Sequence, residues 1–558
     1  MRLFPMISGQ GRGFWAQASG ALAIAGLIAG CGDNYRPTVL PVGSNGPAAQ
    51  PTSYAVVVSS TGSATSDGVV TIIDYSGDTI MTEATIGPGP TAFTLDVPSA
   101  NGYTLNSDKT ISNFPITTSL QAKSVSFSSL STTSAIVNLT PLSFGLWASD
   151  LNGDVVDLFI GSPQALKATV PVATSASSAT MPMFIAGTPT PSGQREYVLS
   201  QNVPDTAPMT CNLTPTTVGV NGVATPIETS AGTADPALAL DPYNPSNAPG
   251  GSTNAQCPVF ALQTPDLQRL YVLNRGSDTI SVINTENNTP DRCTPFTNQS
   301  GQLVTCHPIL PLSLTAVSNL TNDAGQPGAP TGIPTTPPNG TAGMTTIAGP
   351  IYAEYNIATG QLVVADYDGG TISVIDVSLD EYGNDSSTFG TTYTIRVGNT
   401  ATPNPASVTV LYDGSKAYTA NQNDDSTGNG TGNGTVTVVN LFTHTVEKTI
   451  PVVGHPRTVV NTQNSEYSKV YVDSPDSPYI TIIESTPTIT DEIDTTVLVE
   501  GLPIDIRTTT QNGSGGNNNY SSRVPGYGQP CNLSAEQLKS SFGPNYLSTL
   551  TLGECQEQ

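Results

Sequence analysis

A hydrophobic strand, a short polar turn and a second strand in which Val or Ile alternates with Thr or Ser recur along the chain. The two clearest copies are residues 270–283 (LYVLNRGSDTISVI) and 362–376 (LVVADYDGGTISVID). Alternation with a period of two, in short runs bounded by Asn, Asp and Gly, is typical of paired β-strands. Further copies begin at or near six other positions, which are Tyr54, Gly102, Leu146, Arg195, Lys416 and Lys469. The pattern therefore predicts eight β-hairpin units.

Several units are followed by a third strand, a corner of the Gly-x-Pro type and a fourth hydrophobic strand. Such corners occur at residues 87–90 (GPGP), 454–456 (GHP) and 501–503 (GLP). Four strands in a period of about 45–55 residues are typical of a propeller blade. One four-stranded sheet cannot cover both of its faces, so blades stack around an axis, and closing the ring leaves only short edges. A solenoid would also stack its repeats, but it needs capping segments, and the sequence offers none that we can identify. The sequence therefore predicts an all-β propeller over residues 54–507.

Residues 270–283 and 362–376 resemble the YVTN-type β-propeller repeat, whose consensus runs Tyr-Val-x-Asn, a turn, and Thr-Val-Ser-Val-Ile-Asp. The resemblance covers about residues 54–507 and is closer in the second half of that range. Relatives of this type are commonly seven-bladed. The resemblance therefore implies a seven-bladed β-propeller with long loop insertions, in which the second or the fourth unit is an insertion or a split blade. An eight-bladed ring is the alternative, because eight units can be counted.

Composition agrees with an all-β fold and narrows the set of partners. Only 11% of the 558 residues are charged, whereas Gly (53) and Pro (46) are frequent. Long helices need Ala, Leu, Glu, Lys and Arg, so an α-helical protein or a doubly wound α/β enzyme is not expected. The net charge of −25 argues against nucleic acid or anionic lipid as a partner, because both require a basic surface.

The first residues predict an exported lipoprotein. Arg2 and Arg12 precede a short apolar run, residues 21–30, that is too short to span a bilayer as a permanent helix. The run ends in Ile-Ala-Gly-Cys at Cys31, which resembles the bacterial lipobox, whose cysteine is lipidated and becomes the mature N-terminus. We therefore expect a signal peptide over residues 1–30 and a Pro/Gly/Ala tether over residues 31–53. The alternative is an ordinary secretory signal. Gly rather than Asp after the cysteine favours the outer membrane of a bacterial cell envelope.

The remaining cysteines predict disulfides in an oxidising compartment. Six cysteines are left once Cys31 is set aside, and an even number in an exported chain favours disulfide bonds. Six cysteines allow 15 connectivities, and proximity in sequence favours three pairs. These pairs are Cys211–Cys257, Cys293–Cys306 and Cys531–Cys555. Metal binding is the alternative, but no Cys-x-x-Cys spacing is present.

Four segments interrupt or follow the repeats. Residues 203–256 and 286–345 are rich in Pro, Thr, Asn and Gly, and we expect them to be long loop insertions. Residues 424–434 (DDSTGNGTGNG) predict an extended hairpin loop of low complexity. Residues 508–558 predict a Gly/Asn linker and a small disulfide-closed tail with one short helix.

Candidate chemistry is sparse. The three histidines, His307, His444 and His455, do not form a recognised catalytic or metal-binding motif, and no catalytic residue and no cofactor are predicted. The acidic turn with Asp150, Asn152 and Asp154 resembles the first half of a calcium loop, but the twelfth position is Gly rather than Glu. Backbone requirements of a hairpin turn explain the same residues, and we prefer that interpretation.

Three function classes remain. We expect first a binding or scaffold module at the bacterial cell envelope, attached to the membrane through its lipid only, with an unidentified protein, glycan or small-molecule ligand. The resemblance implies a lactonase-like hydrolase with its site in the central channel as an alternative, although three histidines leave little acid–base equipment. A structural envelope or surface-layer protein is the third class, and fold alone does not choose among them.

Overall fold

The computed structural model describes residues 53–509, apart from residues 97, 143–144, 173–179, 188–194, 203–220, 243–254, 265, 294, 298–300, 302, 313–346, 381, 425–432, 464–467 and 486–490. Contacts divide the chain into residues 1–50 and residues 51–558, and every described residue belongs to the second unit. The described part contains β-strands and two short 3₁₀ turns, η1 (Ala122–Ser124) and η2 (Arg275–Ser277). In this part, no helix is long and apolar enough to cross a membrane.

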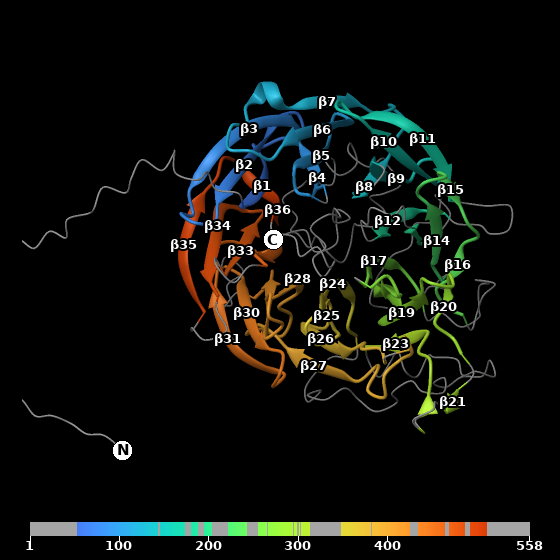
Figure 1. Cartoon of the computed structure of the whole chain (residues 1–558). Coiled ribbons are helices and arrows are strands. Elements are labelled where there is room, and N and C mark those ends of the chain that lie inside the picture. Colours follow the sequence, from blue (N-terminus) through green and yellow to red (C-terminus); the bar gives the residue numbers. More distant parts are fainter. Residues whose placement is uncertain are drawn as a thin grey trace, which may run out of the picture. The chain divides into compact units, whose positions relative to one another are not determined.

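The described strands of residues 54–508 form eight antiparallel sheets, which are the blades of a propeller, and one separate two-stranded hairpin (Figure 1). Blade 1 consists of β36 (Leu502–Thr508), β1 (Tyr54–Ser60), β2 (Asp67–Asp74) and β3 (Ile80–Pro88), and blade 2 of β4 (Pro90–Leu95), β5 (Asn101–Asn106), β6 (Thr110–Pro115) and β7 (Ser126–Ser129). Blade 3 consists of β8 (Ile136–Leu142), β9 (Gly145–Asp150), β10 (Val155–Ile160) and β11 (Ala165–Pro171). Blade 4 consists of β12 (Pro182–Gly187), β13 (Arg195–Ser200), β14 (Val223–Glu228), β15 (Thr233–Ala234) and β16 (Leu238–Ala239). Blade 5 consists of β17 (Pro258–Gln263), β18 (Arg269–Asn274), β19 (Thr279–Asn284), β20 (Thr289–Pro290) and β23 (Ile309–Pro311). Blade 6 consists of β24 (Pro350–Asn356), β25 (Gln361–Asp366), β26 (Thr371–Asp376) and β27 (Thr392–Arg396). Blade 7 consists of β28 (Pro405–Val410), β29 (Lys416–Asn421), β30 (Thr435–Asn440) and β31 (Thr445–Pro451), and blade 8 of β32 (Thr458–Asn461), β33 (Lys469–Ser474), β34 (Ser477–Glu484) and β35 (Glu492–Leu498).

The ring closes through its inner strands. Each of β4, β8, β12, β17, β24, β28, β32 and β36 contacts the next, and β36 contacts β4 again. The last strand, β36, pairs with β1, so blade 1 combines the first three strands of the repeat region with the final one. The strand that sequence analysis placed fourth in each unit is therefore the first strand of the following blade.

The preferred expectation of seven blades is wrong, because the structure has eight. The second unit, which begins at Gly102, forms a complete sheet of β4 to β7, and the fourth unit forms the sheet that contains β13. Every hairpin unit counted in the sequence became a blade. Each blade packs one face of its sheet against the preceding blade and the other face against the following blade. The number of hairpin units in the sequence therefore equals the number of blades in the ring.

The two long segments expected to be insertions contribute strands to the blades. Within residues 203–256, β14 is the third strand of blade 4, and β15 and β16 are two short pieces of its outer edge. Within residues 286–345, β20 and β23 both pair with β19 and form a split outer edge of blade 5. A small hairpin, β21 (Phe296–Thr297) and β22 (Leu303–Val304), lies between them in the sequence. The outer strands of blades 4 and 5 are thus interrupted rather than absent.

Corners of the Gly-x-Pro type lead the chain into β4, β32 and β36. Proline is the first residue of β4, β12, β17, β24 and β28, and the pairing register shifts directly after it in each case. Proline cannot donate to the sheet and is tolerated at such bulges. Gly454, before β32, has φ +78°, and a Cβ there would lie 2.7 Å from Asp476 Oδ1, so this corner requires glycine.

Side chains from facing blades form the core. Phe260 of β17 lies between two aromatic rings of the neighbouring inner strands, with ring centroids 5.0 Å from Phe184 and 4.8 Å from Tyr352. In blades 2, 5 and 7, the Asn of the Tyr-Val-x-Asn pattern bonds to the paired strand of its hairpin. Asn274 Nδ2 donates to the hydroxyls of Thr279 and Ser281 on the paired strand, and Asn106 and Asn421 make the equivalent bonds. The repeat thus encodes both the hairpin and its packing.

Candidate functional site

A recurring polar contact joins neighbouring blades on the face that carries the first-to-second and third-to-fourth strand connections. The second strand of blades 4, 5, 7 and 8 begins with Lys or Arg and has Tyr two residues later, in the pairs Arg195 and Tyr197, Arg269 and Tyr271, Lys416 and Tyr418, and Lys469 and Tyr471. In each pair, at least one side chain reaches an Asp or Asn in the third-to-fourth strand connection of the next blade. We call this contact the tyrosine clasp. Arg195 instead pairs with Glu228 of its own blade, and in the described structure the Tyr271 hydroxyl has no hydrogen-bond partner.

The clasp is most complete where blades 7 and 8 meet. Lys416 Nζ lies 2.9 Å from Asp491 Oδ2, and the Tyr418 hydroxyl donates to Asp491 Oδ1 at 2.5 Å. Lys469 and Tyr471 bind Asp78 in the same way across the junction of blades 8 and 1.

Blades 4 and 5 supply simpler versions of the clasp. The Tyr197 hydroxyl donates to Asn288 Oδ1 at 2.8 Å, and Arg269 pairs with Asp385 at 3.5 Å. A buried hydrogen bond to a charged group contributes about 1.5–3 kcal/mol, so clasps hold their junctions shut.

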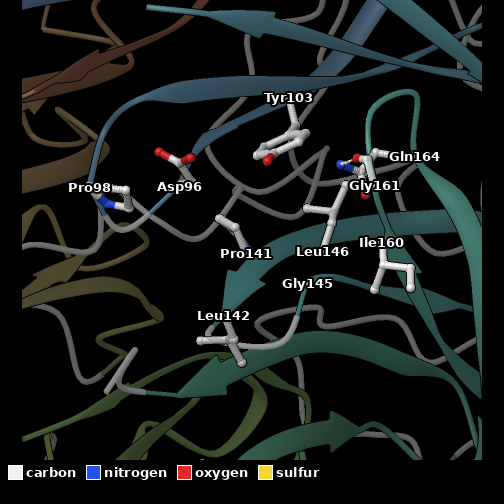
Figure 2. Close-up of a pocket in the computed structure, with 10 residues that line it drawn as sticks. All are labelled: Asp96, Pro98, Tyr103, Pro141, Leu142, Gly145, Leu146, Ile160, Gly161 and Gln164. Atoms are coloured by element: carbon white, nitrogen blue, oxygen red, sulfur yellow. Dashed lines mark hydrogen bonds between the residues drawn. The ribbon is translucent and has the colours of Figure 1, made fainter. Parts of the chain in front are cut away.

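The junction of blades 2 and 3 keeps the tyrosine but lacks the clasp. Asn101 stands where blades 4, 5, 7 and 8 have Lys or Arg, and Tyr103 follows two residues later. The facing turn offers Gln164, whose Nε2 donates back to Gly161 O within the same turn. A cavity of about 360 Å³ lies at this junction, and we call it the junction pocket (Figure 2). This volume is within the range of small-molecule sites.

Three connections of two blades build the pocket. Blade 2 supplies the segment after β4 and the start of β5, and blade 3 supplies the β8–β9 and β10–β11 hairpins. Half of its lining residues are Pro, Leu or Ile. The ten lining residues are Asp96, Pro98, Tyr103, Pro141, Leu142, Gly145, Leu146, Ile160, Gly161 and Gln164.

The polar groups of the pocket converge from opposite sides. Figure 2 shows the Tyr103 ring pointing into the space, with the Asp96 carboxylate on one side and Gln164 on the other. Asp96 Oδ1 accepts hydrogen bonds from the backbone N–H groups of Ala100 and Asn101, which fixes the carboxylate in place. Burial raises the pKa of Tyr103 to about 12, and the negative charge of Asp96 adds to that rise. The Tyr103 hydroxyl therefore keeps its proton at neutral pH.

Gln164 lines the pocket. Its side chain is nine-tenths buried, and within the described part of the chain Oε1 is fully buried and has no hydrogen-bond partner. The bond from Nε2 to Gly161 O holds the amide within its own turn. A buried polar atom without a partner costs free energy unless a ligand or water satisfies it.

The proposed calcium-loop residues lie in the β9–β10 turn of blade 3, and their side chains hold backbone groups. Asp150 Oδ1 accepts from the N–H of Ala135 and of Asn152, and Asp154 Oδ1 accepts from the N–H of Met181. Across the described ranges, no group of three or more His, Cys, Asp or Glu side chains could hold a metal ion. The turn thus has a backbone role, and calcium binding there stays an untested hypothesis.

One predicted disulfide is confirmed, and of a second predicted disulfide only one cysteine lies in the described residues. Cys293 and Cys306 are bonded and close the stem of the β21–β22 hairpin. Cys257 is also disulfide-bonded, and its predicted partner Cys211 lies outside the described residues. Cys31, Cys531 and Cys555 lie outside them as well.

The histidines lie away from the junction pocket. His307 Nδ1 is 2.6 Å from Asp385 Oδ2 in a buried cluster between blades 5 and 6. His455 pairs with Asp476 at a blade corner, which holds the pKa of Asp476 below its usual value although burial opposes this. His444 lies in the β30–β31 turn and stacks on Tyr393 with ring centroids 3.6 Å apart.

Two buried glutamates depart from the apolar pattern of their surroundings. Glu196 of β13 is fully buried, and both carboxyl oxygens lack a hydrogen-bond partner in the described structure, so burial raises its pKa well above the usual value. Glu354 lies on the inner strand β24, and burial raises its pKa to about 8, against hydrogen bonds from Thr409, Val410 and Gln463. Of the inner-strand charges, Asp505 binds Arg507 through Oδ2 at 2.6 Å.

Sequence reasoning missed Asp96, Tyr103 and Gln164. An alignment of the eight hairpin units would have shown Asn101 in place of a basic residue beside a retained Tyr103. That departure is the sequence signal of the pocket.

No protein-family model and no curated protein sequence matches the chain. Among solved structures, the periplasmic gluconolactonase PpgL of Pseudomonas aeruginosa is 12% identical, with 82% of this chain and 98% of that chain covered and a TM-score of 0.42. AztD from Citrobacter koseri, in its apo form, is 11% identical, with 82% and 98% covered and a TM-score of 0.46. Dihydro-heme d1 dehydrogenase NirN, in complex with DHE, is 13% identical, with 84% and 78% covered and a TM-score of 0.49. These likenesses carry no argument about activity. The chain is a β-propeller by its own strand topology.

Proposed function

We propose that this chain is a lipid-anchored binding protein of the bacterial cell envelope, on the outer membrane, that holds a small ligand in the junction pocket. The lipobox-like tetrapeptide that ends at Cys31 supports the anchor, and the Cys293–Cys306 disulfide is in keeping with an oxidising compartment. The Tyr and Asn positions of the hairpins support assignment to the YVTN-type repeat.

One observation carries the binding function. Five blades have Tyr at the third position of their second strand, and the junction pocket lies beside Tyr103, which lacks the basic residue two positions earlier. The Asp96 carboxylate and the Tyr103 hydroxyl line this space together with Pro, Leu and Ile side chains. Such a combination of apolar walls and a few fixed polar groups is typical of small-molecule sites.

Ligand-observed NMR with a library of low-molecular-weight fragments tests the pocket. The blocking variant is Ile160→Trp, because Ile160 lines the pocket and is 38% exposed, so a larger side chain fits without disturbing the core. The control is Leu166→Trp on the paired strand, 57% exposed and outside the pocket lining. We expect fragment signals that Ile160→Trp removes and Leu166→Trp retains. If no fragment signal depends on Ile160, the junction pocket is not a ligand site.

Palmitate labelling in a bacterial host tests the anchor independently. We expect the label on the wild-type chain and its loss in Cys31→Ser, with the protein moving from the membrane to the soluble fraction. Labelling that persists in Cys31→Ser contradicts the lipoprotein assignment.

A further inference from the structure

The charge of the junction pocket restricts what it can hold. Its ten lining residues contribute one carboxylate, Asp96, and no Lys, Arg or His. An anionic ligand would meet this carboxylate in a partly desolvated space, where repulsion between like charges is stronger than in water. The net charge of −25 also raises the local concentration of cations over that of anions. The pocket therefore selects against phosphates and carboxylates.

Hydrogen-bonding capacity restricts the ligand further. The Asp96 carboxylate only accepts hydrogen bonds, the amide nitrogen of Gln164 is committed to Gly161 O, and the Tyr103 hydroxyl can donate or accept. A ligand that faces Asp96 must therefore bring N–H or O–H donors. Hydrogen bonds to a charged acceptor are about twice as strong as those between neutral groups when the donor is also charged.

The walls indicate the rest of the ligand. Pro98, Pro141, Leu142, Leu146 and Ile160 offer an apolar surface, and the Tyr103 ring offers an aromatic face that attracts a cation. On the premise that the junction pocket is a ligand site, we propose that its ligand is a small organic ammonium ion, in which a positively charged nitrogen faces Asp96 and the Tyr103 ring and an apolar group contacts the wall.

A series of three probes separates charge from shape. Benzylammonium, benzyl alcohol and benzoate share one ring and carry charges of +1, 0 and −1, and each is titrated against the wild-type protein by saturation-transfer NMR. We expect benzylammonium to bind at least about tenfold more tightly than benzyl alcohol, which corresponds to about 1.4 kcal/mol. Benzoate should not compete. Raising the NaCl concentration should weaken the ammonium and leave the alcohol unchanged, because only the first is screened.

Variants assign the selectivity to residues. Asp96→Asn should remove the preference for the ammonium. Asp108→Asn is the matched control, because Asp108 also accepts from a backbone N–H in a turn of blade 2 but does not line the pocket. If Asp96→Asn perturbs the fold, the salt titration of the wild-type protein tests the charge preference without a variant.

The outcomes distinguish this inference from the proposed function. Equal binding of the three probes, blocked by Ile160→Trp, would refute the cation preference and leave the pocket as a ligand site. Binding of the ammonium that Ile160→Trp does not block would place it elsewhere and refute this inference, while the fragment library would still decide on the pocket. Failure of all three probes to bind would refute the ligand class, while the fragment library still decides on the pocket.

Discussion

Glu354 makes the stability of the propeller depend on pH. This side chain is 2% exposed on the inner strand β24, and burial raises its pKa from 4.5 to about 8. A carboxyl with a higher pKa in the folded state binds its proton more tightly when folded. The stabilisation that it provides is complete below about pH 4.5 and is lost as the pH rises towards 8. Glu354→Gln removes the titration and keeps an acceptor for Gln463 Nε2, which lies 3.1 Å from Glu354 Oε1.

The size of the effect follows from the rise in pKa. Each pKa unit corresponds to about 1.36 kcal/mol, so a rise from 4.5 to about 8 corresponds to about 5 kcal/mol over the whole range. Between pH 5.5 and 7.5, the wild-type protein should lose about 2.7 kcal/mol more unfolding free energy than Glu354→Gln. Other buried carboxyls with raised pKa values, such as Asp366 at about 7, are present in both proteins and cancel in the difference.

Urea unfolding at pH 5.5, 6.5 and 7.5 measures this difference through the fluorescence of the fully buried Trp147. Glu484→Gln is the matched control, because Glu484 ends β34 in an exposed position, and it should follow the wild type at every pH. Parallel pH dependence of the wild type and Glu354→Gln would show that the inner-strand carboxyl does not titrate differently on folding, and would refute the reasoning.

Three further predictions concern the clasps, the buried side chain of Glu196 and the Cys293–Cys306 disulfide. Tyr418→Phe removes hydrogen bonds to Asp491 and Ser485 and should lower the unfolding free energy by about 1–3 kcal/mol in the same urea titration. Tyr103→Phe, at the junction without a clasp, should change the unfolding free energy by less than about 0.5 kcal/mol. Glu196→Leu replaces a buried carboxyl without partners and should raise the melting temperature at pH 7 in calorimetry; a lower melting temperature would contradict the assignment of Glu196 as a destabilising group. Cys306→Ser opens a loop whose closure by the disulfide contributes about 3 kcal/mol to stability. Protease cleavage within residues 293–306 should therefore become faster. An unchanged cleavage rate would show that the pairing of β21 with β22 is enough to hold the hairpin.

Local pattern was sufficient to predict the hairpins. The strands β18 and β19 span Arg269–Asn284, and the sequence pattern had marked residues 270–283. Alternation with a period of two is a property of each strand by itself, so it can be read without knowledge of the neighbours. The number of blades was predicted wrongly because the usual ring size of relatives was given more weight than the eight hairpins in this sequence.

Features that depend on two blades at once could not be predicted from the pattern. The outer edges of blades 4 and 5 are built from strands of two or three residues, such as β15 and β20, which are too short to show any alternation. The junction pocket results from a missing contact between Asn101 and the β10–β11 turn, about 60 residues later. The absence of this contact can be recognised only by comparing Tyr103 with the tyrosines that form clasps at other junctions.

The pairing of β36 with β1 sets an order of events for an exported chain. The backbone N–H of Tyr54 binds Thr509 Oγ1 across a sequence separation of 455 residues. A chain that crosses a membrane with its N-terminus first, as proposed here, therefore presents β1 as an unpaired strand edge until residue 508 has crossed. Open edges recruit other strands and promote aggregation. Completion of translocation is thus also the step that removes the open edge, and the rate of export, rather than that of hairpin formation, would determine how long the chain needs protection by a chaperone.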